Sequence, residues 1–317
     1  MTQNKTKVSI GLPVYNGDNY LTEAIESVLA QTHENFELII SDNASIDGTE
    51  EICRTYAAQD GRITYLRNPE NLGAAPNYNN TFHVANGRYF KWIAHDDRCA
   101  PEFLQRAVEI LDNEPNVVVC YSQTILIDQH GDVIEHYSDD LHLRSPEPFQ
   151  RFQKLVNTPG WCNPIFGLMR SSVLAKTPLI ANYPRSDRNL LAELTLYGEF
   201  YELPEFLLHR RVHPQISTEV HYQEKELAVW FDTRNKNRLI LPRWRRYSEY
   251  LHMARRAPIS MTDRLRVIGF LSKNVFSLDK LRSLGSDLLT GARTSLRSAN
   301  NPPDSSQENQ LADDHSQ

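Results

Sequence analysis

The sequence lacks the features that mark several classes of protein. Its four cysteines form no Cys-x-x-Cys pair and no zinc-ligand spacing, and Cys53 and Cys120 fall in apolar helix-like and strand-like patterns. We therefore expect buried, reduced thiols, as in a reducing cytosol. The opening residues MTQNKTK carry no apolar stretch, and no uncharged apolar run reaches about 18 residues. These absences predict a cytoplasmic protein without a signal peptide or a membrane-spanning helix.

Two nucleotide-binding motifs are also missing. The first expected strand, residues 7–12, is not followed by Gly-x-Gly-x-x-Gly, and the Gly-x-x-x-x-Gly-Lys-Ser/Thr pattern of a P-loop occurs nowhere. The first motif would hold a dinucleotide pyrophosphate at a helix N-terminus, and the second would cradle the phosphates of a nucleoside triphosphate. A dinucleotide-binding enzyme and a P-loop NTPase therefore both lose support.

The net charge of −6 hides an uneven distribution along the chain. Residues 1–223 carry 18 Lys and Arg against 29 Asp and Glu, whereas residues 224–297 carry 16 against 7. Residues 298–317 carry no Lys or Arg and 4 Asp and Glu, with almost no apolar side chains. We expect this last segment to be disordered, because it has too little apolar surface to fold.

Strands and helices alternate in the first part of the chain. Apolar runs predict strands, and helical spacing between them predicts helices, in the order 7–12, 18–31, 36–40, 49–59, 63–66, 77–86, 89–94, 101–113 and 117–121. This alternation predicts an α/β fold with a Rossmann-like, mostly parallel sheet flanked by helices. Right-handed crossovers bring the loops after such strands to one edge. We therefore expect convergence there of Tyr15, Asp42, Asn71, Asp96 and Asp97.

The alternation breaks after residue 121. A hairpin is expected around the turn at 130–132, followed by a helix at 149–156, a strand near 165–169, a helix at 188–198 and two short strands near 200–203 and 206–209. Helical spacing resumes at 222–256 and continues at 261–285. These patterns divide the chain into a main domain (1–221, with halves 7–121 and 122–221), a basic helical C-terminal extension (222–297) and a disordered tail (298–317).

Two adjacent carboxylates, Asp96 and Asp97, follow the expected strand at 89–94 and precede a helix that opens at Pro101. Open α/β sheets bind ligands at the carboxyl ends of their strands. Adjacent carboxylates are costly unless positive charge neutralises them, and a hard divalent cation shared with ligand phosphates is the usual partner. The alternative is a solvated turn before a helix, because paired aspartates are common in loops.

Several short motifs occur in a fixed order on the expected strands and loops. They are VSIGLPVYN at 8–16, SDNASIDGT at 41–49, Asn71-Leu72-Gly73, and HDD at 95–97 followed by Pro101. As a set they resemble the family 2 glycosyltransferases, which have the GT-A fold, over residues 7–215. Each motif alone is weak, but the set in this order is specific.

The resemblance implies an inverting enzyme that uses a nucleotide-diphosphate sugar and a divalent metal, Mn²⁺ or Mg²⁺. The first half of the main domain would bind the nucleotide sugar, with Asp42 on the base and Asp96 on the ribose side. The implied nucleotide-sugar-binding residues are Pro13, Tyr15, Asn16, Asp42, Ser45, Asn71, Gly73 and Asp96. Asp97 would bind the metal, His213 would lie close to the metal or the diphosphate, and Asp187 would be the catalytic base.

The sequence departs from the family pattern in three places. Ala94 stands where an acidic residue is common, Ser186 precedes Asp187 where a glutamate is common, and no Gln-x-x-Arg-Trp motif of processive synthases follows. The third departure implies transfer of a single sugar rather than polymerisation. The implied acceptor is a hydroxyl of a glycan or a lipid-linked molecule, in cell-surface polysaccharide or glycolipid synthesis. Trp161 and Asn163 either line the acceptor site or only pack their Gly/Pro-containing loop.

Each assigned residue also has a plainer structural alternative. Asp187 could cap a helix, and Asp42 could cap the turn that follows it. His213 could be an ordinary surface-loop histidine, and Tyr15 could serve loop packing. An aromatic ring in a loop after a strand is nevertheless a natural stacking surface for a nucleotide base.

The basic segment at 222–297 mixes arginines with aromatic and aliphatic residues at helical spacing. Such a segment either makes peripheral contact with an anionic membrane, at the inner face for a cytoplasmic enzyme, or packs on the main domain with a solvated basic face. We expect no nucleic-acid partner, because no recognised motif accompanies the charge.

Two rival functions belong to other classes. A sugar-phosphate nucleotidyltransferase would need a Gly-rich, basic first loop, which GLPVYNGDN at 11–19 does not provide. The presence of Asp42, Asp97 and Asp187 speaks against a non-catalytic nucleotide-sugar-binding or scaffold protein.

Overall fold

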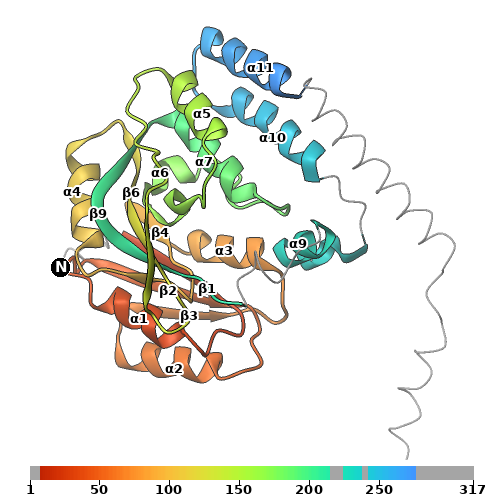
Figure 1. The fold of residues 1–317 in the computed structure, drawn as a ribbon. Helices are drawn as coiled ribbons and strands as arrows, with labels where there is room; N and C mark the ends of the chain where they lie inside the picture. Colours follow the sequence, from red (N-terminus) through yellow and green to blue (C-terminus); the bar gives the residue numbers. More distant parts are fainter. Residues whose placement is uncertain (1–7, 215–223, 238–241, 276–317) are drawn as a thin grey trace, which may run out of the picture.

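The computed structural model describes residues 8–214, 224–237 and 242–275. Its first half contains four parallel strands in the order β3-β2-β1-β4. The strands are β1 (Val8–Val14), β2 (Phe36–Asp42), β3 (Ile63–Arg67) and β4 (Tyr89–Trp92). The intervening helices are α1 (Leu21–Leu29), α2 (Thr49–Gln59) and α3 (Ala74–His83), with α4 (Phe103–Asn113) following β4. Figure 1 shows α1 and α2 on one face of these strands and α3 on the other.

The second half extends the same sheet across β4. The strand order continues β4-β8-β6-β9-β5, and β7 pairs with a later stretch of β6 than β8 does. The added strands are β5 (Arg98–Cys99), β6 (Val117–Ile127), β7 (Val133–Tyr137), β8 (Leu168–Arg170) and β9 (Glu199–Arg211). The pairings place β1, β2, β3, β4, β6 and β9 in one direction, and β5, β7 and β8 run against them. The expected α/β fold with a mostly parallel sheet is confirmed.

Several expected boundaries are wrong. The two short strands near 200–203 and 206–209 are one strand, β9, because the register with β6 shifts around Pro204 and the pairing resumes at Phe206. A proline cannot donate to a ladder, so such an irregularity lets the strand continue. Residues 163–166 form a 3₁₀ helix, η1, before the short β8. The expected strand at 89–94 ends at Trp92, and the short strand β5 was not anticipated.

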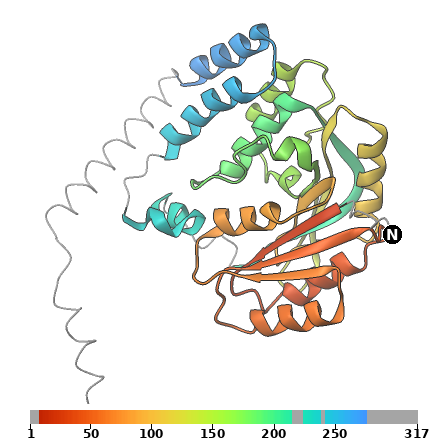
Figure 2. The same cartoon turned by 180° about the vertical axis from the view of Figure 1, so that it is seen from behind.

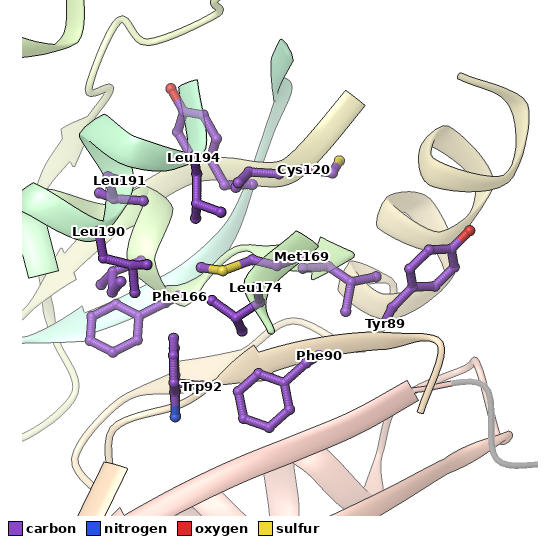
Figure 3. Close-up of a cluster of buried hydrophobic side chains, with 14 of the residues drawn as sticks. Tyr89, Phe90, Trp92, Cys120, Phe166, Met169, Leu174, Leu190, Leu191 and Leu194 are labelled. Carbon is purple, nitrogen blue, oxygen red and sulfur yellow. The ribbon is translucent and has the colours of Figure 1, made fainter. Parts of the chain in front are cut away.

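A buried apolar cluster fixes β4 in the middle of the sheet. Tyr89, Phe90 and Trp92 are fully buried, and Figure 3 shows them in one cluster with Met169 of β8 and Leu190 of the helix α7 (Ser186–Tyr197). The rings of Phe90 and Trp92 meet edge to face at 5.0 Å, and the Trp92 indole N–H donates to the carbonyl of Tyr78 at 3.0 Å. A strand covered on both faces reads as a continuous apolar run. The packing holds the strand that leads into Asp96 and Asp97.

The described part of the basic C-terminal segment packs on the main domain. It comprises α9 (Glu224–Phe231), the 3₁₀ helix η2 (Thr233–Asn237), α10 (Pro242–Arg256) and α11 (Met261–Val275). Figures 1 and 2 show α10 and α11 against α5 (Pro148–Asn157) and α7, and α9 beside α3. Met253 is fully buried, Phe270 contacts Phe152 edge to face, and the Arg256 guanidinium pairs with the buried Glu193 at 2.8 Å. The packing alternative is therefore observed for these helices.

The remaining expectations for this region lie outside the described residues. The helical pattern beyond residue 275 and the tail at 298–317 belong to that part. Among the helices of the described ranges, none has the length and apolar character needed to cross a bilayer. The four cysteines are free and buried, as expected.

Candidate active site

The loops after β1, β2 and β3 meet at one edge of the sheet. The backbone N–H of Asn16 donates to the Ser45 hydroxyl at 2.9 Å, and the Asn16 side-chain oxygen accepts from the N–H of Ile46 at 3.0 Å. The Asn71 side-chain oxygen accepts from the N–H of Gly73 at 2.9 Å and from the Asn43 amide at 2.8 Å. These bonds bring three of the expected nucleotide-binding motifs together, as their positions after parallel strands require.

Pro13 lies inside β1 rather than in the loop after it. The sequence suggested that the strand stops there, but β1 runs to Val14. The carbonyl of Gly11 faces β4, where it accepts from the N–H of Ile93, so the alternation of a strand also turns Pro13 toward that side. The pairing with β4 ends at Gly11, so the missing N–H of the proline costs no ladder hydrogen bond. Tyr15 follows with 42% of its surface exposed.

Asp42 is fully buried at the end of β2 and has three donors of its own. Its Oδ1 accepts from the N–H of Ser45 at 2.9 Å, and its Oδ2 accepts from the Tyr65 hydroxyl at 2.8 Å and from the Arg67 guanidinium. The turn-capping alternative is thus observed. The predicted contact of Asp42 with a nucleotide base stays a prediction.

The acidic pair is held by the end of β9. Asp97 is 3% exposed and accepts from the backbone N–H of Arg211 at 2.9 Å. The Asp96 Oδ2 lies 3.0 Å from Nε2 of His213, and the Arg211 guanidinium donates to the Asp96 carbonyl at 3.0 Å and to Glu23 at 2.7 Å. His213 is buried, with its ring 5.0 Å from that of Tyr20. The interpretation of the acidic pair as a solvated turn is therefore wrong, and so is the interpretation of His213 as a surface-loop histidine.

The two carboxyls of this pair differ in their proton affinity. Burial, together with the neighbouring charge of Asp96, raises the pKa of Asp97 to about 7. Burial also works against ionisation of Asp96, but the hydrogen bond with His213 and the charges of His95 and His213 lower its pKa overall. Two buried carboxyls that cannot both ionise cheaply indicate a site short of positive charge.

This donor set fits a hard divalent cation. No cluster of three or more His, Cys, Asp and Glu side chains with metal-binding geometry occurs in the described ranges. A Mg²⁺-type ion needs only one or two protein ligands when phosphate oxygens and waters complete its coordination. Asp97, raised in pKa by burial, and the nearby His213 are groups that such an ion would stabilise in their deprotonated forms.

Asp187 lies in the first turn of α7. The helix begins at Ser186 after the left-handed Arg185, and no side chain caps it. The Ser186 hydroxyl instead donates to the carbonyl of Ala181 at 2.8 Å. The helix-cap alternative for Asp187 is therefore wrong. Burial raises the pKa of the Asp187 carboxyl, although the charge of Arg210 works in the opposite direction.

Arg210 was not among the residues expected at the site, although its charge acts on two of the acidic groups. Its charge lowers the pKa of Asp97 and of Asp187, against the larger effect of burial on both. Its guanidinium donates to the carbonyl of Trp161 at 2.9 Å and to the Asn163 side-chain oxygen at 2.7 Å, and it stacks 4.8 Å from the Trp161 ring. Two adjacent arginines at the end of a strand, just before His213, were the available signal.

Comparisons with known proteins define the class. The model of the family "Glycosyl transferase family 2" matches residues 9–175, more than half of the chain. An uncharacterised glycosyltransferase of Rickettsia typhi is 32% identical over 70% of this chain and 70% of its own length. The putative teichuronic acid biosynthesis glycosyltransferase TuaG of Bacillus subtilis is 32% identical over 51% of this chain and 62% of its own. The chain belongs to glycosyltransferase family 2, and it is a glycosyltransferase.

Solved structures confirm the GT-A fold. The crystal structure of a fragment of S. aureus TarS in complex with UDP-GlcNAc covers 86% of this chain and 73% of that chain, with a TM-score of 0.60 and 16% identity. The same fragment in complex with UDP gives a TM-score of 0.58 at 17% identity, over 87% of this chain. At this level of identity the likeness concerns the fold.

Proposed function

We propose that the protein transfers a single sugar, with inversion, from a nucleotide-diphosphate sugar to a hydroxyl of a glycan or lipid-linked acceptor. The observation that carries the proposal is the buried Asp97, whose pKa is raised to about 7 beside a second carboxyl at the carboxyl end of the sheet. The names of two relatives support the substrate class, since TarS was crystallised with UDP-GlcNAc and TuaG is assigned to teichuronic acid synthesis. Cell-surface polysaccharide or glycolipid synthesis is the corresponding setting.

The donor would bind across the loops of the first half. Tyr15 offers an exposed ring to the base, with Pro13, Asn16 and Ser45 shaping the loops around it. Asn71 and Gly73 form the neighbouring loop, Asp42 would recognise the base edge, and Asp96 would take the ribose side. The hydrogen bonds among these loops hold them together, which would reduce the entropy lost when the donor binds.

A divalent cation, Mn²⁺ or Mg²⁺, would be held by Asp97 with His213 close by. Bound there, it would neutralise the charge that develops on the leaving diphosphate. The chain contributes the rigid frame: the N–H of Arg211 fixes Asp97, and the Asp96–His213 contact fixes the histidine ring.

Asp187 would remove the proton of the acceptor hydroxyl. Burial raises its pKa, which makes the carboxylate a stronger base than an exposed aspartate. Attack by the activated hydroxyl on the face opposite the diphosphate inverts the anomeric centre. Glycoside hydrolysis would instead need two carboxylates flanking the sugar bond, and Asp96 and Asp97, adjacent in sequence, make a poor flanking pair.

Three further assignments complete the proposal. Residues 1–221 form the catalytic domain, with a nucleotide-sugar half at 7–121 and an acceptor half at 122–221, and residues 222–297 extend it. The enzyme works in the cytoplasm, with peripheral contact to the inner face of the membrane. Exposed apolar side chains on α10 and α11 support such contact, namely Trp244, Leu251, Met261 and Leu265.

Release of nucleoside diphosphate from a panel of nucleotide sugars, with Mn²⁺ or Mg²⁺, tests the function. We expect release from one donor, with transfer to a suitable glycan increasing the rate. Asp187→Asn should retain donor binding while the rate falls by about 10²-fold or more. If no donor is turned over by the wild-type protein with any acceptor glycan, the scaffold alternative replaces this proposal.

A further inference from the structure

Asp139 turns inward between two exposed residues, Ser138 and Asp140, in the loop that follows β7. Its neighbours are fixed at the surface: the Ser138 hydroxyl donates to Glu202 at 2.5 Å, and Asp140 pairs with Lys154 at 2.7 Å. The next N–H, of Leu141, donates to the hydroxyl of Tyr121 at 3.0 Å. Asp139 itself is 4% exposed, and its Oδ1 has no hydrogen-bond partner among the described residues.

Asn163 presents the complementary group. It is 1% exposed, and its side-chain oxygen accepts from the Arg210 guanidinium at 2.7 Å. Because a guanidinium only donates, this bond fixes the orientation of the amide. The Nδ2 donor then has no partner within the described part of the chain. Burial raises the pKa of the Asp139 carboxyl to about 6, although the Asn163 side chain and backbone N–H lie close enough to interact with that carboxyl and lower its pKa. A buried acceptor and a buried donor are thus adjacent without a well-formed hydrogen bond between them, an arrangement that a water or a ligand hydroxyl would complete.

The two buried groups lie just below the surface. Gly160 is exposed, and a Cβ placed on it would be 3.1 Å from the Asp139 Oδ1 and 2.8 Å from the Tyr137 hydroxyl. The exposed Gly160 therefore covers the Asp139 Oδ1 at close range. Next along the chain, Trp161 keeps 36% of its surface exposed while Arg210 stacks on its ring.

The chemistry of this cluster selects among ligands. An anion such as phosphate would be repelled by the Asp139 carboxylate, and a cation would be opposed by the charge of Arg210. A sugar hydroxyl both donates and accepts, so one hydroxyl can give its proton to a carboxylate and accept from an amide. An exposed indole beside the polar pair suits the apolar face of a sugar ring.

We propose that Asp139 and Asn163, with Trp161 beside them, form a subsite that binds hydroxyl groups of a sugar ring. This inference rests on the proposed glycosyltransfer, and it adds residues that the family motifs do not include. The sugar is either the glycosyl group of the donor or the sugar at the acceptor end. The subsite is electrostatically linked to the assigned catalytic groups, because the charge of Arg210 lowers the pKa of Asp139, Asp97 and Asp187.

Two variants and one control test the subsite. Asp139→Asn keeps the shape of the side chain but weakens its acceptor, and Gly160→Ala places a methyl group where the hydroxyl would approach. Asp140→Asn is the matched control, because Asp140 is the exposed neighbour of Asp139. Circular dichroism and thermal melting establish that all three variants fold.

The ligands separate the two sources of the sugar. Calorimetry compares UDP, GDP, dTDP and CDP with their sugar conjugates, and saturation-transfer NMR measures methyl glycosides of glucose, galactose, N-acetylglucosamine, mannose and rhamnose. If the subsite binds the donor sugar, both variants lower the affinity for the sugar conjugate by about 10-fold or more and leave the affinity for the parent diphosphate unchanged. If the subsite binds the acceptor sugar, both variants lower the affinity for the methyl glycoside by the same factor and leave the affinity for every nucleotide unchanged. The Asp140→Asn control matches the wild type in both cases.

The remaining outcomes overturn the inference. If conjugates and glycosides bind both variants as they bind the wild type, the polar pair is satisfied by water and serves structure only. If no sugar ligand binds the wild type, the subsite does not exist. If the wild type binds methyl glycosides but no nucleotide, the proposed donor site is contradicted instead. The methyl glycosides then still report on Asp139.

Discussion

Replacing Asp97 by asparagine should abolish transfer while making the metal-free protein more stable. Burial and the charge of Asp96 raise the pKa of Asp97 from 3.8 to about 7. Each pKa unit corresponds to about 1.4 kcal/mol, so the ionised carboxylate costs the native state up to about 4 kcal/mol. Asparagine removes this cost and keeps an oxygen that can accept the N–H of Arg211, which Asp97 binds at 2.9 Å.

The sign of the pH dependence follows from the direction of the shift. Between pH 4 and pH 7 the native state binds more protons at Asp97 than the unfolded state, so the stability of the wild type falls as pH rises. Above about pH 7 the loss is complete and constant. The advantage of Asp97→Asn should therefore grow across this window and level off above it.

Thermal melting between pH 5 and 8, in EDTA, measures the effect. We expect the variant to melt higher at pH 8 by roughly 5–10 °C and to match the wild type more closely at pH 5. Asp140→Asn, at a side chain 80% exposed, should show no such difference. A variant that melts lower than the wild type at pH 8 would refute the reasoning, because Asp97 would then be a stabilising group.

Three further predictions concern the base and the packing of the extension. Because burial raises the pKa of Asp187, kcat/KM for transfer should fall as pH drops through a value above that of an exposed aspartate, and Asp187→Asn should lack this limb of the profile. Arg256→Ala leaves the buried Glu193 without its cation and should destabilise the fold by about 3 kcal/mol in urea unfolding, a loss that added Glu193→Gln should reduce. Gly73→Ala combines a φ of +91° with a Cβ 2.7 Å from the backbone of α9–η2, so it should cost at least about 2 kcal/mol, whereas Gly61→Ala, with open space around it, should cost little. An unchanged pH profile in Asp187→Asn would contradict the assignment of the base. Equal stability of Gly73→Ala and Gly61→Ala, or of Arg256→Ala with and without Glu193→Gln, would contradict the packing account.

The first half of the fold was predictable because local pattern determines it. The strands ending at Val14, Asp42 and Arg67 alternate with helices, and parallel pairing of such units brings their loops to one edge. The second half was harder to predict. The continuity of β9 through Pro204 depends on a shift of register with β6, which no local signal specifies.

The candidate site was likewise predictable only in part. Asp96 and Asp97 were visible as a motif after a strand, but their environment comes from residues far away in the sequence. Arg211 donates to Asp97 across a separation of 114 residues, and Arg210 reaches Asn163 across 47. The inward turn of Asp139 is likewise invisible locally, because its exposed neighbour Asp140 has the same side chain. Such contacts depend on how the halves of the sheet join.

Nucleotide binding measured by calorimetry tests the central claim most directly. UDP, GDP, dTDP and CDP are titrated into the wild type with Mn²⁺, into the wild type with EDTA, and into Asp97→Asn with Mn²⁺. We predict that one diphosphate binds the wild type with Mn²⁺ and that its affinity falls at least about 10-fold both in EDTA and in the variant. Binding that is the same in all three conditions would contradict the metal site at Asp97. No binding of any diphosphate to the wild type would contradict the nucleotide-sugar donor itself.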